Sequence, residues 1–189
     1  MIRSMVFLPG NTPNMLLNGE ILEADAVILD LEDAVSPNEK DSARILVRNF
    51  LRKMRSSLKQ VIVRINSMDT EYWKKDLEVI VPLKPDAVMA TKVSGPGTIA
   101  EISSYMDEIE KAHGMQENTV RLLALIETAQ GIRNVYRIAA EGSRICGMLL
   151  GAEDLTADLH CRRTKEGTEI FYARNRLVCA ARAAGIEAY

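Results

Sequence analysis

Two carboxylates stand at the positions where this sequence could perform chemistry. Glu127 directly follows the apolar run 122–126, and Asp154 comes soon after the run 145–150. Two carboxylates in an apolar setting repel each other unless a cation lies between them. An oxygen-only pair suits Mg²⁺, which takes one or two protein carboxylates and completes its shell with water and substrate oxygens. The alternative is that each carboxylate forms a structural ion pair with Arg64 or Lys92.

Other apolar runs also end in charged residues. Asp30 and Glu32 share one face of their run, because side chains alternate along a strand. Arg64 can fork onto a carboxylate or keto oxygen. It can equally form a buried ion pair with Asp30 or Glu32, and the two roles are compatible because such a pair would orient the guanidinium. We therefore expect Asp30 and Glu32 to support Arg64 from behind.

Two further groups could contact a substrate. The backbone N–H groups of Ala152 and Glu153, in the turn after Gly151, could hold a substrate carboxylate. Lys92 could form a Schiff base with a carbonyl compound, which would predict a metal-free aldolase. Neighbouring acids would keep its amine protonated and unreactive, so we expect Lys92 to be a supporting structural cation.

Short apolar runs alternate with amphipathic segments, and this order predicts the fold. The runs lack polar alternation, as in parallel strands covered on both faces. They are 5–8, 26–31, 61–65, 86–90, 122–126 and 145–150. Helices are expected from Pro13, from Ser36-Pro37 to about Met54 (with Ile45, Leu46, Asn49 and Leu51 at helical spacing), over 98–112 with an apolar stripe of Ile99, Ile102, Met106 and Ile109, and from Thr168 to about Gly185.

The positions of the charged residues distinguish between two α/β architectures. The turn Pro9–Pro13 lacks the glycine pattern of a dinucleotide-binding sheet. In a TIM (β/α)₈-type barrel the carboxyl ends of all strands meet at one mouth, where active sites lie. We therefore predict one barrel domain over residues 1–189, with about six βα units and without the C-terminal units. Such open strand edges invite association, which predicts a homo-oligomer.

Composition excludes several classes of function. The net charge of −2 gives no overall electrostatic attraction to nucleic acid or to an anionic membrane. Cys146, Cys161 and Cys179 are too scattered for a disulfide framework or a zinc site, which favours reduced packing residues. Pro9 and Gly10 interrupt the N-terminal apolar run too early for a signal peptide, and no run reaches the ~20 residues of a membrane span. These features predict a soluble, cytoplasmic protein.

The motifs that carry these residues resemble a known family. In order along the chain they are F-L-P-G-N-x-P, V-I-L-D-L-E-D-A-V, V-R-I-N, L-I-E-T-A-x-G and G-A-E-D-L-T-A-D-L. With them the sequence resembles the HpcH/HpaI aldolase/citrate lyase superfamily over all 189 residues. The segment R-T-K-E-G-T-E-I-F-Y-A-R, followed by A-A-R-A-A-G-I, is most similar to the citrate lyase β-subunit branch.

This resemblance implies a TIM barrel, bound Mg²⁺, and cleavage of a carbon–carbon bond in a 3-hydroxyacyl thioester. In the citrate lyase branch, citryl-acyl carrier protein or citryl-CoA gives the acetyl thioester and oxaloacetate, and other citrate lyase subunits are partners. Arg64 matches the substrate-binding arginine, Glu127 the metal ligand that also contacts substrate, and Asp154 the second metal ligand. The resemblance thus makes Arg64 and Glu127 the predicted catalytic residues.

Some features leave alternatives open. A malyl-CoA or citramalyl-CoA lyase would use the same chemistry on a different acid. Because the family's C-terminal part, which supplies a lid and an acidic residue, is absent, a catalytically weak or silent binding homologue is a further alternative. His160 stands where the family often has Gly, and a solvent-exposed loop position is expected for it. The basic loop 162–165 could meet CoA phosphates or an acidic carrier protein, or be simply solvated.

Overall fold

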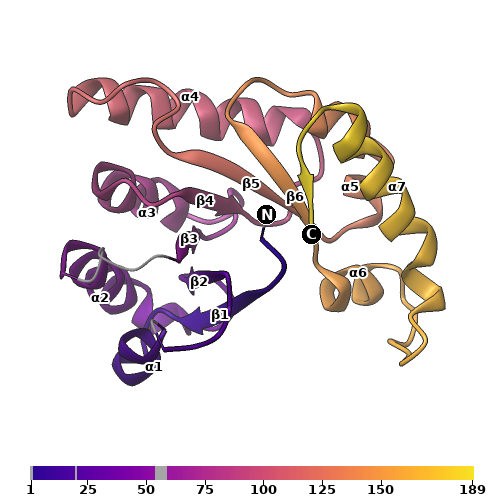
Figure 1. Cartoon of the computed structure of the whole chain (residues 1–189), viewed down its shortest axis with the longest axis horizontal. Helices are drawn as coiled ribbons and strands as arrows, with labels where there is room; N and C mark the ends of the chain where they lie inside the picture. The colour runs from indigo at the N-terminus through magenta and orange to yellow at the C-terminus, as the bar shows by residue number, and fades with distance from the viewer. Residues whose placement is uncertain (1, 20, 54–58) are drawn as a thin grey trace. The chain divides into compact units, whose positions relative to one another are not determined.

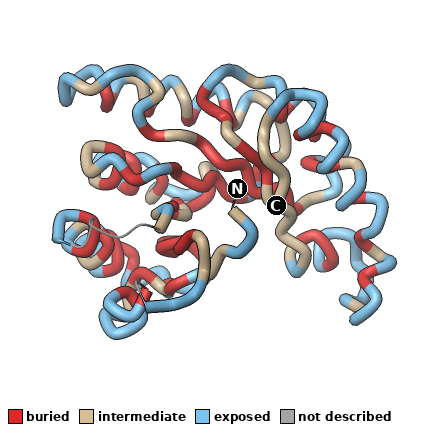
Figure 2. Tube along the Cα trace, viewed as in Figure 1, coloured by how far each residue is buried: buried red, intermediate tan, exposed pale blue. Residues whose placement is uncertain are grey.

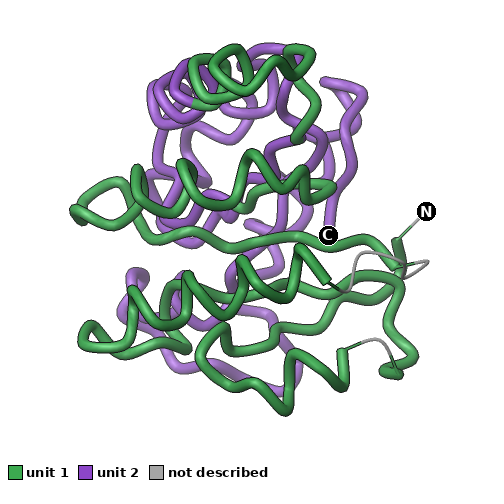
Figure 3. Tube along the Cα trace, turned by 90° about the vertical axis from the view of Figure 1, so that its left-hand side faces the viewer, with its two compact units in different colours: residues 1–89, 106–120 green, residues 90–105, 121–189 purple. Residues whose placement is uncertain are grey.

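The computed structural model describes residues 2–19, 21–53 and 59–189, in which strands alternate with helices (Figure 1). The chain divides into two compact units (Figure 3). Unit 1 comprises residues 1–89 and 106–120, and unit 2 comprises residues 90–105 and 121–189. Helix α4 (Pro96–Ala112) contributes to both. The prediction of a single domain over residues 1–189 stays a prediction.

Unit 1 contains the first four predicted strands. They are β1 (Met5–Pro9), β2 (Ala26–Asp30), β3 (Gln60–Arg64) and β4 (Ala87–Ala90), whose last residue belongs to unit 2. Consecutive strands pair in parallel, and Asp30 lies opposite Arg64 in the register of β2 and β3. All five residues of β2 are buried, as its unbroken apolar sequence requires of a strand covered on both faces.

The helices of unit 1 are α1 (Pro13–Asn18), α2 (Lys40–Lys53) and α3 (Tyr72–Ile80), with 3-10 turns η1 (Pro37–Glu39) and η2 (Val81–Leu83). Pro13 opens α1 as expected, although the Thr12 side chain makes no capping hydrogen bond. Helix α2 confirms the helix predicted after Ser36-Pro37, and the predicted end near Met54 lies outside the described residues.

The buried face of α2 differs from the one that its sequence suggested. Ala43, Val47 and Leu51 are buried in the core of unit 1, whereas Ile45 is 48% exposed. The helix begins at Lys40 after a separate 3-10 turn. The buried residues stand at i, i+4 and i+8, so they form one helical stripe that includes Leu51 of the predicted set, and Ile45 lies outside it.

Unit 2 contains three parallel strands, β5 (Arg121–Ile126), β6 (Ile145–Leu150) and the short β7 (Glu187–Ala188). Its helices are α5 (Ala129–Ala139), α6 (Ala152–Asp158) and α7 (Phe171–Ala183), which follows the 3-10 turn η3 (Thr168–Ile170). The segment after Gly151, expected to be a turn, is in fact the start of α6. Strand β7 follows the six predicted βα units.

Burial is concentrated on the strands and on one stripe of each longer helix (Figure 2). The predicted stripe of α4 is confirmed, because Ile99, Ile102, Met106 and Ile109 are all buried. None of the helices in the described part of the chain is both long and apolar enough to cross a membrane.

Candidate active site

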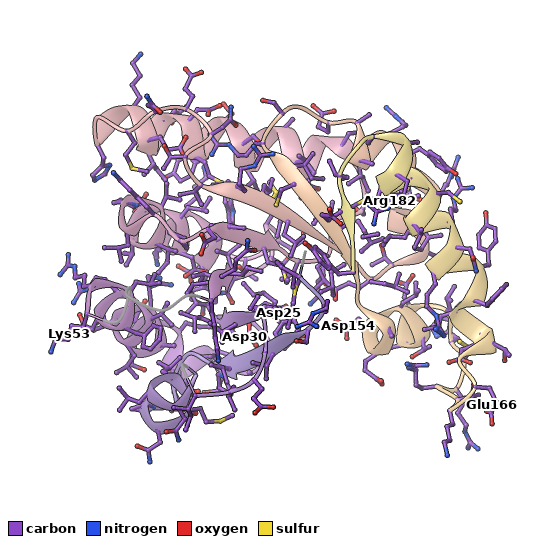
Figure 4. The ribbon with its side chains drawn as sticks, viewed as in Figure 1. Asp25, Asp30, Lys53, Asp154, Glu166 and Arg182 are labelled. Carbon is purple, nitrogen blue, oxygen red and sulfur yellow. The ribbon has the colours of Figure 1, made fainter. Side chains whose placement is uncertain are left out.

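In unit 1, Arg64 is held by Asp30 at the carboxyl ends of neighbouring strands. Arg64 Nε donates to Asp30 Oδ1 at 2.7 Å and Nη2 donates to Oδ2 at 2.5 Å, which makes the pair bidentate. Glu32 Oε2 lies 3.3 Å from Arg64 Nη1. Asp30 and Glu32 thus both contact Arg64, and their role as supports of a substrate-binding arginine stays a prediction. Figure 4 labels Asp30 at the end of β2.

The Asp30 carboxylate also fixes the loop that follows β2. Its Oδ1 accepts the N–H of Glu32 at 2.8 Å, and its Oδ2 accepts the N–H of Ala34 at 3.0 Å. Asp30 is fully buried, and a buried carboxylate is tolerated only when it is paired and hydrogen-bonded in this way. The aspartate therefore sets the loop geometry and the direction of the guanidinium together.

Arg64 remains charged in this setting. Burial opposes its positive charge, but the hydrogen bonds that it donates to Asp30 and the charges of Asp30, Glu32 and Asp33 outweigh burial and raise the pKa of the guanidinium above its usual range. The guanidinium carbon also lies 4.8 Å from the centroid of the Phe7 ring, which favours a cation. With 11% of its side chain exposed, Arg64 is a fixed cation that a ligand can still reach.

Two residues near Arg64 and its acidic partners, Phe7 and Lys40, were not anticipated from the sequence. Lys40 Nζ donates to the carbonyl oxygens of Leu31 and Glu32 at 2.8 and 2.6 Å. Burial lowers the pKa of Lys40, against the charges of nearby acids that raise it. The place of Phe7 in the first apolar run, one residue before Leu8, could have indicated its position near the strand end. The acidic segment 30–33 could have indicated that a second cation, Lys40, lies close to it.

In unit 2, Glu127 follows β5 and is buried, with 3% of the residue exposed. Its Oε1 accepts the backbone N–H of Lys92 at 2.7 Å. Lys92 has a φ of +52°, a left-handed conformation that is uncommon for a residue with a side chain. This conformation accompanies an N–H that points at the carboxylate. The support that Lys92 gives to Glu127 therefore includes its main chain.

The chain after Glu127 is fixed by two hydrogen bonds. Thr128 caps α5, since its Oγ1 accepts the N–H of Gly131 at 3.0 Å. The Asp158 carboxylate accepts the N–H of Ala129 at 2.7 Å. The sequence T-A-Q-G thus ends the strand sharply and leaves Glu127 as the first side chain beyond the buried run.

Gly151 lies directly beside the Glu127 carboxylate. Its N–H donates to the carbonyl oxygen of Ile126 at 3.0 Å, which continues the pairing of β5 and β6 beyond the strand ends. A Cβ at position 151 would lie 2.6 Å from Glu127 Oε2 and 2.7 Å from Glu127 Cβ. Only glycine leaves room for the carboxylate in this position.

Asp154 lies in the first turn of α6 and is half-buried (Figure 4). The predicted backbone donors Ala152 and Glu153 open the same helix, where N–H groups have no partner within the helix. The Glu153 side chain itself points to solvent and lies 3.4 Å from Arg163 Nε. Any contact of Glu153 with substrate would thus use its main chain. That Asp154 and Glu127 share an ion remains a prediction.

The basic loop after α6 is held by an acid of its own. Glu169 pairs with Arg163 at 2.9 Å and accepts from Thr164, and these hydrogen bonds, first of all those from Thr164, lower the pKa of Glu169 to about 2. His160 is exposed, as expected, and has a φ of +53°. Arg163 is therefore partly neutralised, while Arg162 and Lys165 remain exposed.

The donor set of unit 2 fits a hard cation. Glu127 and Asp154 offer oxygen ligands, and the space left by Gly151 lies against the Glu127 carboxylate. Among the described residues no three His, Cys, Asp or Glu side chains form a metal cluster. An ion held here would complete its shell with water and substrate oxygens, as Mg²⁺ does. The prediction that Arg64 of unit 1 serves the same ligand remains a prediction.

Comparison with known proteins gives a consistent family. The sequence model of the family described as HpcH/HpaI aldolase/citrate lyase matches residues 3–189. Citrate lyase subunit beta of Leuconostoc mesenteroides subsp. cremoris is 41% identical over 187 residues, which are 99% of this chain and 62% of that protein. A (3S)-malyl-CoA thioesterase of Cereibacter sphaeroides is 34% identical over 97% of this chain and 60% of its own length.

A solved structure of similar fold is the citrate lyase beta subunit from M. tuberculosis complexed with oxaloacetate and magnesium. It superposes with a TM-score of 0.78 at 29% identity, over 97% of this chain and 77% of that one. This likeness confirms the predicted α/β fold of the TIM-barrel type. The chain spans about 62% of the length of the citrate lyase subunit that it matches.

Proposed function

Because this chain belongs to the HpcH/HpaI aldolase/citrate lyase family, we propose that it acts as a Mg²⁺-dependent carbon–carbon lyase. The proposed substrate is a citryl thioester, on an acyl carrier protein or on CoA, and the products are the acetyl thioester and oxaloacetate. The observation that supports this proposal best is the buried Glu127 carboxylate beside Gly151, with Asp154 on the following turn. Two carboxylates in such a setting are expected where a divalent ion binds and presents an oxyacid substrate.

The reaction breaks the bond between the hydroxyl-bearing carbon and the carbon next to the thioester. The hydroxyl loses its proton and becomes the ketone of oxaloacetate. The electron pair of the broken bond goes to the departing acetyl thioester as an enolate, which then takes up a proton at carbon. A bound Mg²⁺ supplies Lewis acidity and orientation for the hydroxyl and its neighbouring carboxylate.

The residues of this chain would divide the work as follows. Glu127 and Asp154 hold the ion, and the Lys92 N–H keeps the Glu127 carboxylate in place. Arg64, fixed by Asp30 and Glu32, offers a permanent positive charge to the oxygen on which charge develops. The N–H groups of Ala152 and Glu153 offer donors to a substrate carboxylate. Within each unit the key side chain is thus held before a ligand binds, Arg64 by Asp30 and Glu127 by the Lys92 N–H.

A malyl thioester is the second candidate substrate. It is favoured by the 34% identity to a protein named (3S)-malyl-CoA thioesterase. Citryl and malyl thioesters both present a hydroxyl and a carboxylate, so the same ligand set accepts either. Citryl differs by one further carboxylate, and the cationic and N–H donors described above suit that extra charge.

An assay of product release tests the proposal. The full chain is incubated with citryl-CoA, citryl-carrier protein or malyl-CoA, with Mg²⁺ or with a chelator, and the acyl product is followed by mass spectrometry. We expect Mg²⁺-dependent release of the acetyl thioester from the citryl substrates, with loss of release in Glu127→Gln. Preference for malyl-CoA would support the second candidate, and no cleavage of any thioester would contradict the enzymatic function of this chain.

The association of several copies also belongs to the proposal. Strands β1 and β7 stand at the two ends of the strand order in the described part of the chain, and the backbone groups of such end strands are usually covered in proteins. Analytical ultracentrifugation gives the mass directly. A mass of one chain at micromolar concentration would contradict the homo-oligomer.

A further inference from the structure

Helices α5 and α7 pack against each other in unit 2 and contain only positive charges. Their arginines are Arg133 and Arg137 on α5, and Arg174, Arg176 and Arg182 on α7. Neither helix contains an Asp or Glu, although the whole chain has a net charge of −2. Such segregation of charge places a basic face on a chain that is otherwise acidic.

Arg176 forms the fixed centre of this face. Its Nε and Nη2 donate to the carbonyl oxygens of Ile132 and Arg133 at 2.9 and 3.2 Å, and its Nη1 donates to the Tyr172 hydroxyl at 3.1 Å. The guanidinium carbon lies 5.3 Å from the Tyr136 ring centroid and 5.8 Å from that of Tyr172. The cation is therefore held between two exposed tyrosines and ties α7 to α5.

The two arginines of α5 can offer their charge to a partner. Arg133 and Arg137 are exposed and lie one turn apart on the same side of the helix as Tyr136. Within the ranges that the structure describes, neither forms an ion pair. Arg182 is different, since it lies 3.5 Å from Glu187. The free charge of the face is thus greatest around Arg133, Arg137 and Arg176.

A pocket of about 320 Å³ adjoins these arginines. Ile132, Leu155 and Leu159 give it apolar walls, while Arg133, Tyr172 and Arg176 line its polar side. Glu169 also lines it, but Thr164 and Arg163 already engage that carboxylate. The pocket can therefore accept an apolar side chain whose neighbours are acidic.

We propose that this α5–α7 face, defined by Arg133, Tyr136, Arg137, Tyr172 and Arg176 with the adjoining pocket, is a docking surface for an acidic protein. Resting on the proposed function, the partner is the acyl carrier protein that presents the thioester. Fixed arginines and tyrosines around an apolar pocket are the residue types that contribute most to protein–protein binding. Their uniform charge complements a carboxylate-rich surface and repels a basic one.

The position of the pocket agrees with this role. Ala129 lines it and comes two residues after Glu127, and Leu155 lines it and directly follows Asp154. A carrier bound here would hold its flexible thioester arm near the strand ends of unit 2, where both proposed ion ligands lie. The segments that follow Glu127 and Asp154 thus contribute to both the docking surface and the candidate site.

The extent of the charged face favours a protein over CoA. The charged groups of the face come from two packed helices, Arg133 and Arg137 from α5 and Arg176 from α7. A single phosphate group would need donors that converge on one point, whereas these charges are distributed over two helices, as contact with an acidic protein surface would require.

Charge reversal tests the docking surface. The double variant Arg133→Glu/Arg137→Glu changes two arginines of α5 that have no assigned role in catalysis. The control Arg48→Glu/Arg52→Glu makes the same change, at the same spacing, on α2 of unit 1. For each full-length protein, the affinity for purified acidic acyl carrier protein is measured by fluorescence anisotropy at two salt concentrations. The kcat/KM for citryl-CoA, the thermal unfolding and the sedimentation coefficient are measured beside it.

We expect the α5 variant to bind the carrier protein on the order of tenfold more weakly at low salt, with a smaller salt dependence, because charges at an interface act mainly on association. The α2 control and the kcat/KM for citryl-CoA should remain at the parent values. Equal carrier binding by both variants, or no binding by the parent, overturns the proposal.

Other outcomes separate the occupants of the face. An equal fall in kcat/KM for citryl-CoA shows that the face serves CoA, and a changed sedimentation coefficient of the α5 variant shows an interface between copies; each contradicts carrier docking. If the parent binds the carrier through this face but cleaves no thioester, the docking surface stands and the proposed lyase function fails.

Discussion

Replacing Gly151 by alanine tests the geometry of the candidate site. The new Cβ would lie 2.6 Å from Glu127 Oε2 and 2.7 Å from Glu127 Cβ. Carbon atoms in contact are ordinarily about 3.5–4.0 Å apart, so the glutamate or the strand end must retreat by about 1 Å. Overpacking of this kind typically costs about 1–3 kcal/mol of folding free energy.

The same displacement should affect ligand binding more than it affects folding. A retreat of the carboxylate stretches its 2.7 Å hydrogen bond from the Lys92 N–H. Misplacement of a reacting group by about 1 Å can lower turnover on the order of 10²-fold. We therefore expect Gly151→Ala to unfold at lower urea concentration and to lose Mg²⁺-dependent cleavage by about that factor, measured with citryl-CoA.

Gly97→Ala is the matched control for this experiment. Gly97 lies in α4, and nothing stands within 4 Å of the position of its missing Cβ. Because Gly97 is the second residue of α4 and alanine has space there, this variant should keep the stability and the activity of the parent. Parent-like stability and turnover in Gly151→Ala would refute the argument that the glycine makes room for the carboxylate.

Three further predictions concern the buried and paired acids. Asp30→Ala leaves the Arg64 guanidinium without its main partner, so we expect a loss of about 3–5 kcal/mol in urea unfolding together with weaker oxaloacetate binding by calorimetry. Asp76→Ala removes the partner of another buried arginine, and should cost a similar free energy of unfolding but leave ligand affinity in the remaining folded protein unchanged; equal loss of affinity in both variants would argue against a specific role of Asp30. The Asp25 carboxyl, whose pKa the hydrogen bonds from Arg3 lower from 3.8 to about 2, stabilises the folded state at pH above its ordinary pKa, and this contribution disappears as the pH falls through about 2. The stability difference between the parent and Asp25→Asn, followed by circular dichroism against pH, should therefore close between about pH 4 and pH 2, and a difference that persists at pH 2 would contradict the pairing.

Much of the fold follows from local sequence. Unbroken runs of Val, Ile and Leu predicted the strands because parallel strands with two covered faces need little polar alternation. Alternation within those runs placed Asp30 on the side where Arg64 could meet it, and the register of β2 and β3 sets the two residues opposite each other. Spacing therefore indicated that Arg64 could pair with Asp30 or Glu32, and left open which of the two is its main partner.

Other features depend on the path of the chain between elements. After the 3-10 turn, the Lys40 side chain at the start of α2 reaches back to the carbonyl groups of residues 31 and 32. Helix α6 is short and has Glu153 and Asp154 in its first turn, so its sequence resembled a turn. The contact between Gly151 and Glu127 joins two strand ends, and apolar spacing within one segment contains no information on it.

Calorimetric titration with oxaloacetate, with and without Mg²⁺, tests most directly whether Glu127 and Asp154 hold a divalent ion for a ketoacid. The parent protein is compared with Glu127→Gln and Asp154→Asn, which keep the size of each side chain and remove its charge. We predict that the parent binds oxaloacetate only when Mg²⁺ is present and that both variants lose this dependence together with the binding. Binding that is independent of Mg²⁺ and unchanged in both variants would contradict the account.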